Sequence, residues 1–265
     1  MLAILLNAIL NALQIGAYAA RLAGVTTGRV GTSISLFNLF VTASRFANMF
    51  YAPMIGSISD AAGKAVRVPA LASAEVAQYT WQMRAVILAA TIGSFVGAAL
   101  LPTFTYMFVR AVGAFERRGS LPHALMRGFD PRVMGDVLRT LRFPPLNLFA
   151  RFSLREVPAK LLIGNVVVTG VYAAGVVASY LASVIQPDVA RTALSASGLV
   201  NGVATIAFTL IVDKAVKGER TLHDVKTMVA YLGLTAVIGT LAAQLILWPA
   251  ALFIGAAAHL INIRH

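Results

Sequence analysis

The chain has 265 residues, of which 58% are hydrophobic and only 12% are charged, about half the charged fraction of an ordinary soluble domain. Its net charge is +12 and it contains no cysteine, so a soluble globular fold, disulfide bonds and thiolate chemistry are excluded. The composition predicts an all-α, polytopic integral membrane helical bundle. We expect residues 1–265 to form a single transmembrane domain of about six helices, with no separate soluble domain.

The first predicted span, residues 2–20, carries a regular stripe of polar residues. Asn7, Asn11, Gln14 and Tyr18 follow one another at helical spacings, so they share one helix face. Such a face lies inside a membrane bundle, where it either lines a polar cavity or supplies hydrogen bonds between helices of ~0.6 kcal/mol each. The sequence leaves these two roles open.

The second predicted span, residues 30–55, has an arginine near its middle. Asn38, Thr42, Arg45 and Asn48 fall on one face of this helix. A guanidinium near the bilayer centre costs at least ~2.5–3.5 kcal/mol, so this face is expected to turn towards protein or a watery cavity. Arg45 is then either a structural residue paired inside the bundle or a contact for an anionic substrate group.

The remaining predicted spans are residues 85–109, 161–186, 192–212 and 227–259. Between the second and third spans, Gly56 to Arg84 is a mixed stretch in which Tyr79 and Trp81 are typical of an interfacial anchor. Pro102 is expected to kink the third span, because proline lacks a backbone donor. The fourth span carries a further polar face, with Asn165, Thr169, Tyr172, Ser179 and Ser183.

Two pairs of glycines have the spacing that lets helices approach closely. Gly93 and Gly97 lie in the third span, and Gly198 and Gly202 lie in the fifth. They can serve contacts within one chain or contacts between two copies. We therefore expect either close packing inside the bundle or a two-fold homodimer.

Residues 110–160 form a basic segment, with ten lysines and arginines against four acids. Its section RVMGDVLRTLRF predicts a basic amphipathic helix on the cytoplasmic membrane surface, able to contact anionic membrane lipids. Of the 22 lysines and arginines, 16 lie in the connections after spans one, three and five, and five lie on the other side. This bias predicts that both termini are extracytoplasmic. It also accounts for the net charge without nucleic-acid binding.

Catalytic chemistry has little support in the sequence. The only Gly-Lys pair, Gly63-Lys64, lacks the remainder of a phosphate-binding loop, so ATP is not the expected energy source. The four histidines stand alone, without metal-ligand spacing or a partnered carboxylate. We expect no catalytic residue, no metal site and no cofactor.

A family resemblance extends over roughly the first 60 residues. It rests on five short motifs: Ala17, Tyr18 and Arg21; Thr27, Gly28 and Arg29; Ser35 to Asn38; Ser44 to Met49; and Ala52 with Pro53. In these motifs the chain resembles the Amj family, the alternate lipid II flippases of bacterial cell-wall synthesis. The number and length of the other spans also agree.

The resemblance implies transport of lipid II, an undecaprenyl-pyrophosphate-linked peptidoglycan precursor, from the inner to the outer leaflet of the bacterial cytoplasmic membrane. On this interpretation eight residues contact the substrate: Arg45, Asn48, Asn38, Arg29, Arg21, Asn11, Gln14 and Tyr18. Other interpretations are a transporter for another polyprenyl-linked glycan or for an ion-coupled solute. A membrane lipid-pyrophosphate phosphatase would need an acid/base or nucleophile cluster, and the sequence shows none.

Overall fold

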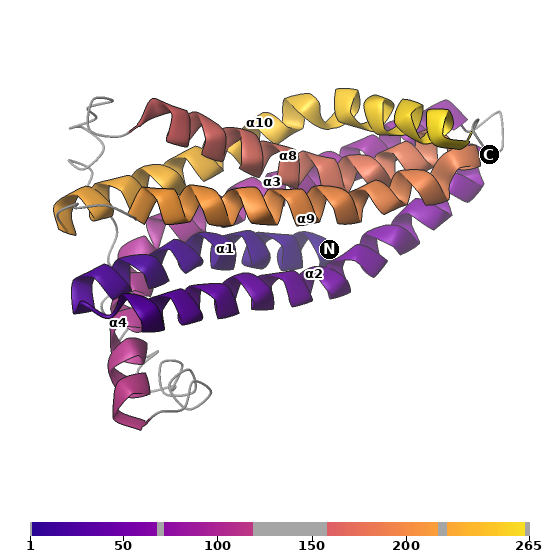
Figure 1. Cartoon of the computed structure of the whole chain (residues 1–265). Helices are drawn as coiled ribbons and strands as arrows, with labels where there is room; N and C mark the ends of the chain where they lie inside the picture. The colour runs from indigo at the N-terminus through magenta and orange to yellow at the C-terminus, as the bar shows by residue number, and fades with distance from the viewer. Residues whose placement is uncertain (1, 68–71, 119–157, 217–221, 263–265) are drawn as a thin grey trace.

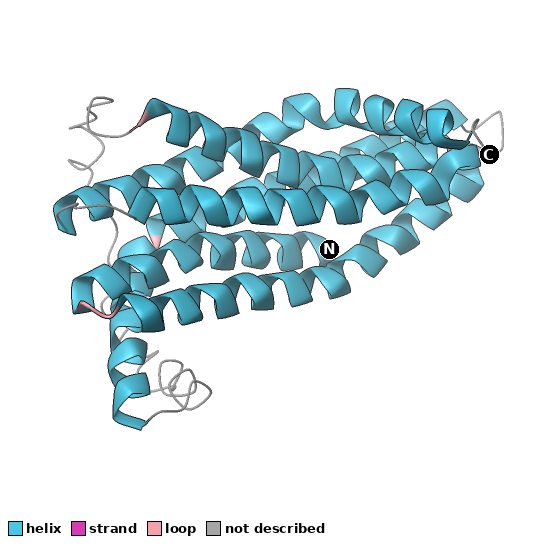
Figure 2. Cartoon of the chain, in the orientation of Figure 1, coloured by secondary structure: helices cyan, strands magenta, loops and turns pink. Residues whose placement is uncertain are grey.

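The computed structural model describes residues 2–67, 72–118, 158–216 and 222–262, and the side chains at 42–50 are among those it does not describe. The described part is helical apart from short connections and contains no strand (Figure 2). Its elements are α1 (Leu2–Thr27), α2 (Val30–Val66), α3 (Ala72–Ala99), α4 (Leu101–Arg118), α8 (Ala159–Ile185), the 3-10 turn η1 (Pro187–Val189), α9 (Ala190–Val216) and α10 (Leu222–Asn262). Most of the basic segment 110–160 lies outside the described residues.

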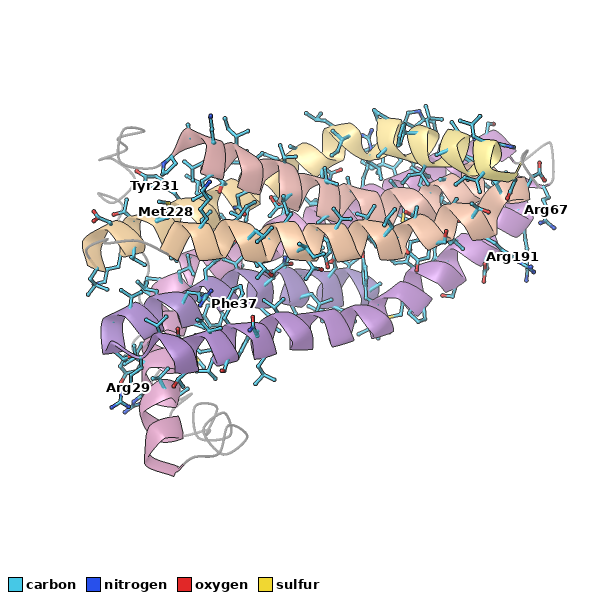
Figure 3. All side chains as sticks on the ribbon, in the orientation of Figure 1. Arg29, Phe37, Arg67, Arg191, Met228 and Tyr231 are labelled. Carbon is cyan, nitrogen blue, oxygen red and sulfur yellow. The ribbon has the colours of Figure 1, made fainter. Side chains whose placement is uncertain are left out.

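The helices α1, α2, α3, α8, α9 and α10 run along one long axis and alternate in direction (Figure 1). The turn at Gly28, the helix α4 and the start of α10 lie at one end of the bundle, which we call the Gly28 end. Arg67, Arg191 and the chain's C-terminus lie at the opposite end, which we call the Arg67 end (Figure 3). Gly28 has a φ of 72°, a left-handed conformation that glycine adopts without a Cβ clash, and it reverses the chain between α1 and α2.

The prediction of an all-α, polytopic membrane bundle is confirmed. In the described part of the chain, five helical stretches are long and apolar enough to cross a membrane: Leu2–Thr27, Ser73–Ala99, Ala159–Ile185, Pro187–Ile211 and Asp224–Asn262. Within α2, Val30–Val41 is a shorter apolar stretch. Large apolar side chains cover the outside, as at Leu199 and Leu245, which are 71% and 81% exposed. Such a surface suits lipid rather than water.

Several predicted boundaries were wrong. Residues 56–84 are not a separate mixed stretch, because α2 continues to Val66 and α3 already begins at Ala72. The predicted span 85–109 is divided at Leu100, since Pro102 cannot continue the helix from α3, and α4 leaves the bundle in another direction (Figure 1). Tyr79 is only 1% exposed and hydrogen-bonds Ser59, so it is not an interfacial anchor, whereas Trp81 is 71% exposed.

The helices form two groups that meet along the bundle. In the first group α1 packs against α2, α3 and α4, and in the second α8 packs against α9 and α10. The groups join mainly where α3 contacts α10 and where α2 contacts α8. One apolar core, near the Gly28 end, includes Phe37 and Leu232, and a second core includes Met83 and Leu181. The polar face of α1 lies between these groups.

Close helix packing at Gly93 and Gly97 is confirmed within the chain. A methyl group at Gly93 would overlap the backbone oxygen of Ala8, and one at Gly97 would lie 2.8 Å from the backbone oxygen of Ala12. These glycines therefore bring α3 against α1. Gly198 and Gly202 differ, because no described atom lies within 4 Å of the methyl position at either residue.

Candidate functional site

The polar stripe of α1 faces the interior, as predicted. Asn7, Asn11 and Tyr18 are 8%, 7% and 0% exposed, and Gln14 is half-buried. The helix does not end at Ala20 but continues to Thr27, so Arg21 is a buried helical residue, 5% exposed, and not a flanking cation. Its position three residues after Tyr18 extends the stripe by almost one turn. The interior face of α1 thus ends in a guanidinium.

Hydrogen bonds attach this stripe to helices from both groups. The Nδ2 atom of Asn7 donates to the Val86 carbonyl of α3 at 2.8 Å, and Asn11 Nδ2 donates to the backbone and side-chain oxygens of Asn7 at 2.8 and 3.0 Å. The Tyr18 hydroxyl donates to Asn165 Oδ1 of α8 at 3.2 Å. Each bond satisfies a polar group that would be costly in hydrocarbon.

Asn165 extends the network into α10. It is fully buried, and its Nδ2 donates to the Leu232 carbonyl and to Thr235 Oγ1, both at 2.9 Å. Through Tyr18, Asn165 and Thr235 a continuous polar path therefore connects α1, α8 and α10. It crosses the boundary between the two helix groups.

Arg21 lies in an aromatic surrounding at the Gly28 end of the stripe. Its guanidinium carbon is 5.2 Å from the centroid of the Phe37 ring, a cation–π geometry. Phe37 in turn stacks on Phe208 of α9, with ring centroids 6.4 Å apart, and Phe208 lies 5.2 Å from Tyr18. A delocalised guanidinium suits such an environment better than an ammonium, because it is less strongly hydrated and stacks on rings.

Two small cavities lie beside the stripe. One, of about 10 Å³, is lined by Asn11, Gln14 and Tyr172 among others, and the second, of about 20 Å³, is lined by Asn7, Asn11, Tyr51 and Tyr172. Each is large enough for about one water, and the lining is polar enough to bind it. The Tyr51 hydroxyl is buried and has no hydrogen-bond partner among the described residues. Each of these two cavities is thus polar and holds nothing larger than a water molecule.

The other residues predicted for the site do not join this group. Asn38 is exposed on α2, because the buried face of this helix passes through Leu36 and Phe37 instead. Arg29 is exposed beside the Gly28 turn, at the N-cap of α2 (Figure 3). The side chains of Arg45 and Asn48 lie outside the described residues, although the backbone at both positions is helical.

Some residues of the site were not singled out from the sequence. Asn165, Thr169 and Tyr172 were recognised as one polar face of α8, but nothing indicated that Asn165 would bond Tyr18. Thr235 of α10 lies among apolar residues, and no sequence pattern indicated that it would belong to the site. Among the described residues no group of three or more histidines or acids could hold a metal ion.

Fold and site together define a class: a polytopic helical membrane protein whose two helix groups enclose a polar interior with a buried arginine. The comparisons with known proteins agree with this class. The family described as "Alternate to MurJ", or Amj, matches residues 6–258, and the chain belongs to this family. It is 33% identical to the protein named lipid II flippase Amj of Bacillus subtilis (strain 168), over 93% of this chain and 91% of the relative. No solved structure matches the chain.

Proposed function

We propose that this chain is a flippase that moves lipid II from the inner to the outer leaflet of the bacterial cytoplasmic membrane. The observation that carries the proposal is family membership along nearly the whole chain, together with a buried polar stripe that ends at Arg21. We assign it transport without hydrolysis, and we treat residues 1–265 as one transmembrane domain.

The chemistry of a lipid-linked pyrophosphate fits the polar interior. Its polyprenyl tail can stay in lipid, while its anionic, sugar-bearing head needs a polar and cationic path across the hydrocarbon. The interior face of α1 offers amides and hydroxyls from Asn7 to Tyr18, and then the guanidinium of Arg21. A guanidinium can grip phosphate oxygens with two parallel hydrogen bonds. We include Arg45, Asn48, Asn38 and Arg29 as further substrate contacts.

Neither of the two described cavities beside the stripe admits more than about one water. Passage of a large head group then requires the two helix groups to part along the α1 face, where Tyr18 bonds Asn165. Rocking of one helix group against another around a central site is a common route to alternating access. The polar path between the groups is the place where such an opening would expose hydrogen-bonding groups to the substrate.

Orientation follows from the basic residues. We propose that the Gly28 end faces the cytoplasm, because 15 of the 22 lysines and arginines belong to the connections expected there once the helical Arg21 is left out. Both termini are then extracytoplasmic.

We further propose a two-fold homodimer through α9. No described atom lies within 4 Å of the methyl position at Gly198 or Gly202, and their neighbours Leu199 and Val203 are 71% and 59% exposed. A second copy could approach closely along this face, as small residues permit in membranes.

The test is a leaflet-accessibility assay for lipid II in bacterial cells depleted of their other lipid II flippases. Expression of the chain should restore lipid II at the outer leaflet. Lipid II that stays inside while the chain accumulates in the membrane would refute the proposal. Purified protein incubated with lipid II should release no phosphate, and released phosphate would instead support a phosphatase.

A further inference from the structure

A large groove lies at the Arg67 end, away from the α1 stripe. Its volume is about 710 Å³, whereas the two interior cavities measure about 10 and 20 Å³. Pockets that bind drug-sized ligands commonly measure roughly 300–1,000 Å³. The groove therefore has the size of a ligand site, although the α1 stripe does not reach it.

The walls of this groove come from both helix groups. One side of the groove is formed by α3, through Val76, Trp81 and Arg84. Another side is formed by Trp248 of α10, and Ile185, the last residue of α8, also lines the groove. Gln244 Nε2 of α10 donates to the Arg84 carbonyl at 2.9 Å, which holds the two main walls together. The groove is thus part of the packed bundle.

Its lining combines an apolar floor with two indole rings and one cation. Trp81 and Trp248 are 71% and 39% exposed, and the Arg84 guanidinium carbon lies 5.9 Å from the Trp81 ring centroid. Tryptophans at the membrane interface commonly anchor helices. Anchoring a helix does not require a 710 Å³ groove between Trp81 and Trp248. It also does not require an arginine over the Trp81 ring.

Exposed apolar residues continue from the groove along its two main walls, α3 and α10. Further along the same helices, Leu88 and Ile92 of α3 and Leu241 and Leu245 of α10 are all at least half exposed. An acyl or polyprenyl chain can lie against these residues while its head group enters the groove. The indole faces suit the apolar faces of sugar rings, and Arg84 suits a phosphate.

We propose that this groove binds the lipid-linked pyrophosphate glycan at the end of its passage, with Arg84 on the pyrophosphate and Trp81 and Trp248 against the sugar. The inference rests on the proposed function and adds a second substrate site. A phospholipid head group would use Arg84 but would leave most of the groove and both indole faces unfilled. The substrate of the proposed function has the larger, sugar-bearing head that fits it.

The chain offers a direct probe, because Trp81 and Trp248 are its only two tryptophans and both line the groove. Purified protein in phosphatidylcholine nanodiscs should show a saturable change in tryptophan emission on titration with lipid II. In Arg84→Gln the half-saturating concentration should rise about tenfold, the loss expected for one hydrogen bond to a charged group.

Arg191→Gln is the matched control, since Arg191 is an exposed cation on α9 at the same end of the bundle (Figure 3) and does not line the groove. It should bind lipid II like the unmodified chain. Phosphatidylglycerol at the same mole fraction should change the emission little. Because the Arg84 side chain is exposed and Gln244 bonds only its backbone, Arg84→Gln should unfold at the unchanged temperature.

Equal responses to phosphatidylglycerol and lipid II would overturn the inference in favour of a general anionic-lipid site. Equal binding by Arg84→Gln and the unmodified chain would also overturn it. Transport is measured with the same purified protein in sealed phosphatidylcholine vesicles, so that the two proposals fail separately. A chain that transports lipid II with no emission change loses the groove assignment but keeps its function. A chain that does not transport loses the function itself.

Discussion

Tyr18 of α1 donates a hydrogen bond to Asn165 of α8 at 3.2 Å, across the boundary between the two helix groups. The two residues are 147 positions apart in the chain. The bond lies in the polar path where the proposed opening would occur. Together with the bond from Gln244 of α10 to the Arg84 carbonyl of α3, it links the two helix groups.

Substituting Tyr18→Phe should favour opening. It removes the hydroxyl and keeps the ring against Phe208, so the closed form should lose ~0.6 kcal/mol, or about threefold in population. The chain has no cysteine, so Tyr172→Cys, beside both cavities, gives a clean labelling site. Labelling by a membrane-impermeant maleimide should be about threefold faster when Tyr18→Phe is also present.

The control for this experiment is Tyr106→Phe, which removes a hydroxyl from a partly exposed tyrosine of α4. It should leave the labelling rate at position 172 unchanged. Equal rates with and without Tyr18→Phe would show that this bond does not hold the groups together.

Arg21→Gln should abolish transport while the chain still inserts and accumulates. The guanidinium is buried on the polar face of α1, and glutamine cannot neutralise a pyrophosphate. Arg21→Lys should retain part of the activity, because an ammonium lacks the planar fork. Lipid II transport and protein level are measured together, with Arg191→Gln as the charge-matched control. Full transport by Arg21→Gln would remove Arg21 from the substrate path.

For Arg45, the sequence alone predicts the same kind of effect on transport. Arg45→Ala should abolish transport without loss of the protein, and Arg45→Lys should keep only part of it, for the same geometric reason. The readout is again leaflet accessibility of lipid II against the amount of inserted chain. Normal transport by Arg45→Ala would make this residue structural at most.

Orientation is tested by fusing a reporter after His265. The charge bias predicts that an extracytoplasmic reporter, such as a periplasmic phosphatase, is active there. The same reporter placed near Arg29 should be inactive, since the Gly28 end is expected in the cytoplasm. Activity of a strictly cytoplasmic reporter at His265 would reverse the orientation.

The interior face of α1 could be predicted from the sequence, whereas its partners could not, and on α2 the predicted face failed because Asn38 is exposed. Asn7 to Tyr18 recur at helical spacing, and such a stripe has to be buried in a membrane protein. The spacing of residues along one helix does not indicate which helix lies opposite. The hydrogen bond from Tyr18 to Asn165 could therefore be identified only from the structure. Arg21 was placed outside the first span because the predicted span ended at residue 20, whereas α1 continues to Thr27. Arg21 lies on the same face, at the next helical interval after Tyr18.

The two glycine pairs show the same limit. Gly93/Gly97 and Gly198/Gly202 have identical spacing, yet the first pair is pressed against α1 and the second faces outward. Two glycines at this spacing allow a second helix to pack closely against that face. They do not indicate whether the second helix belongs to the same chain or to another copy. The surrounding apolar residues are alike in both helices, so the pattern could not separate them.

The packed environment of Gly97 and the open environment of Gly202 predict different effects of a glycine-to-leucine substitution on the stability of the chain. Gly97→Leu should destabilise the chain itself by several kcal/mol, because even a methyl group there would lie 2.8 Å from the Ala12 oxygen, and a leucine side chain overpacks the α1–α3 contact further. Gly202→Leu meets open space, so the monomer should fold normally, while the proposed α9 interface should weaken. Thermal unfolding in detergent separates the two effects on the fold. Native mass measurement in lipid then compares the dimer fraction of Gly202→Leu with that of the unmodified chain. A chain that is fully active and only monomeric would contradict the dimer proposal.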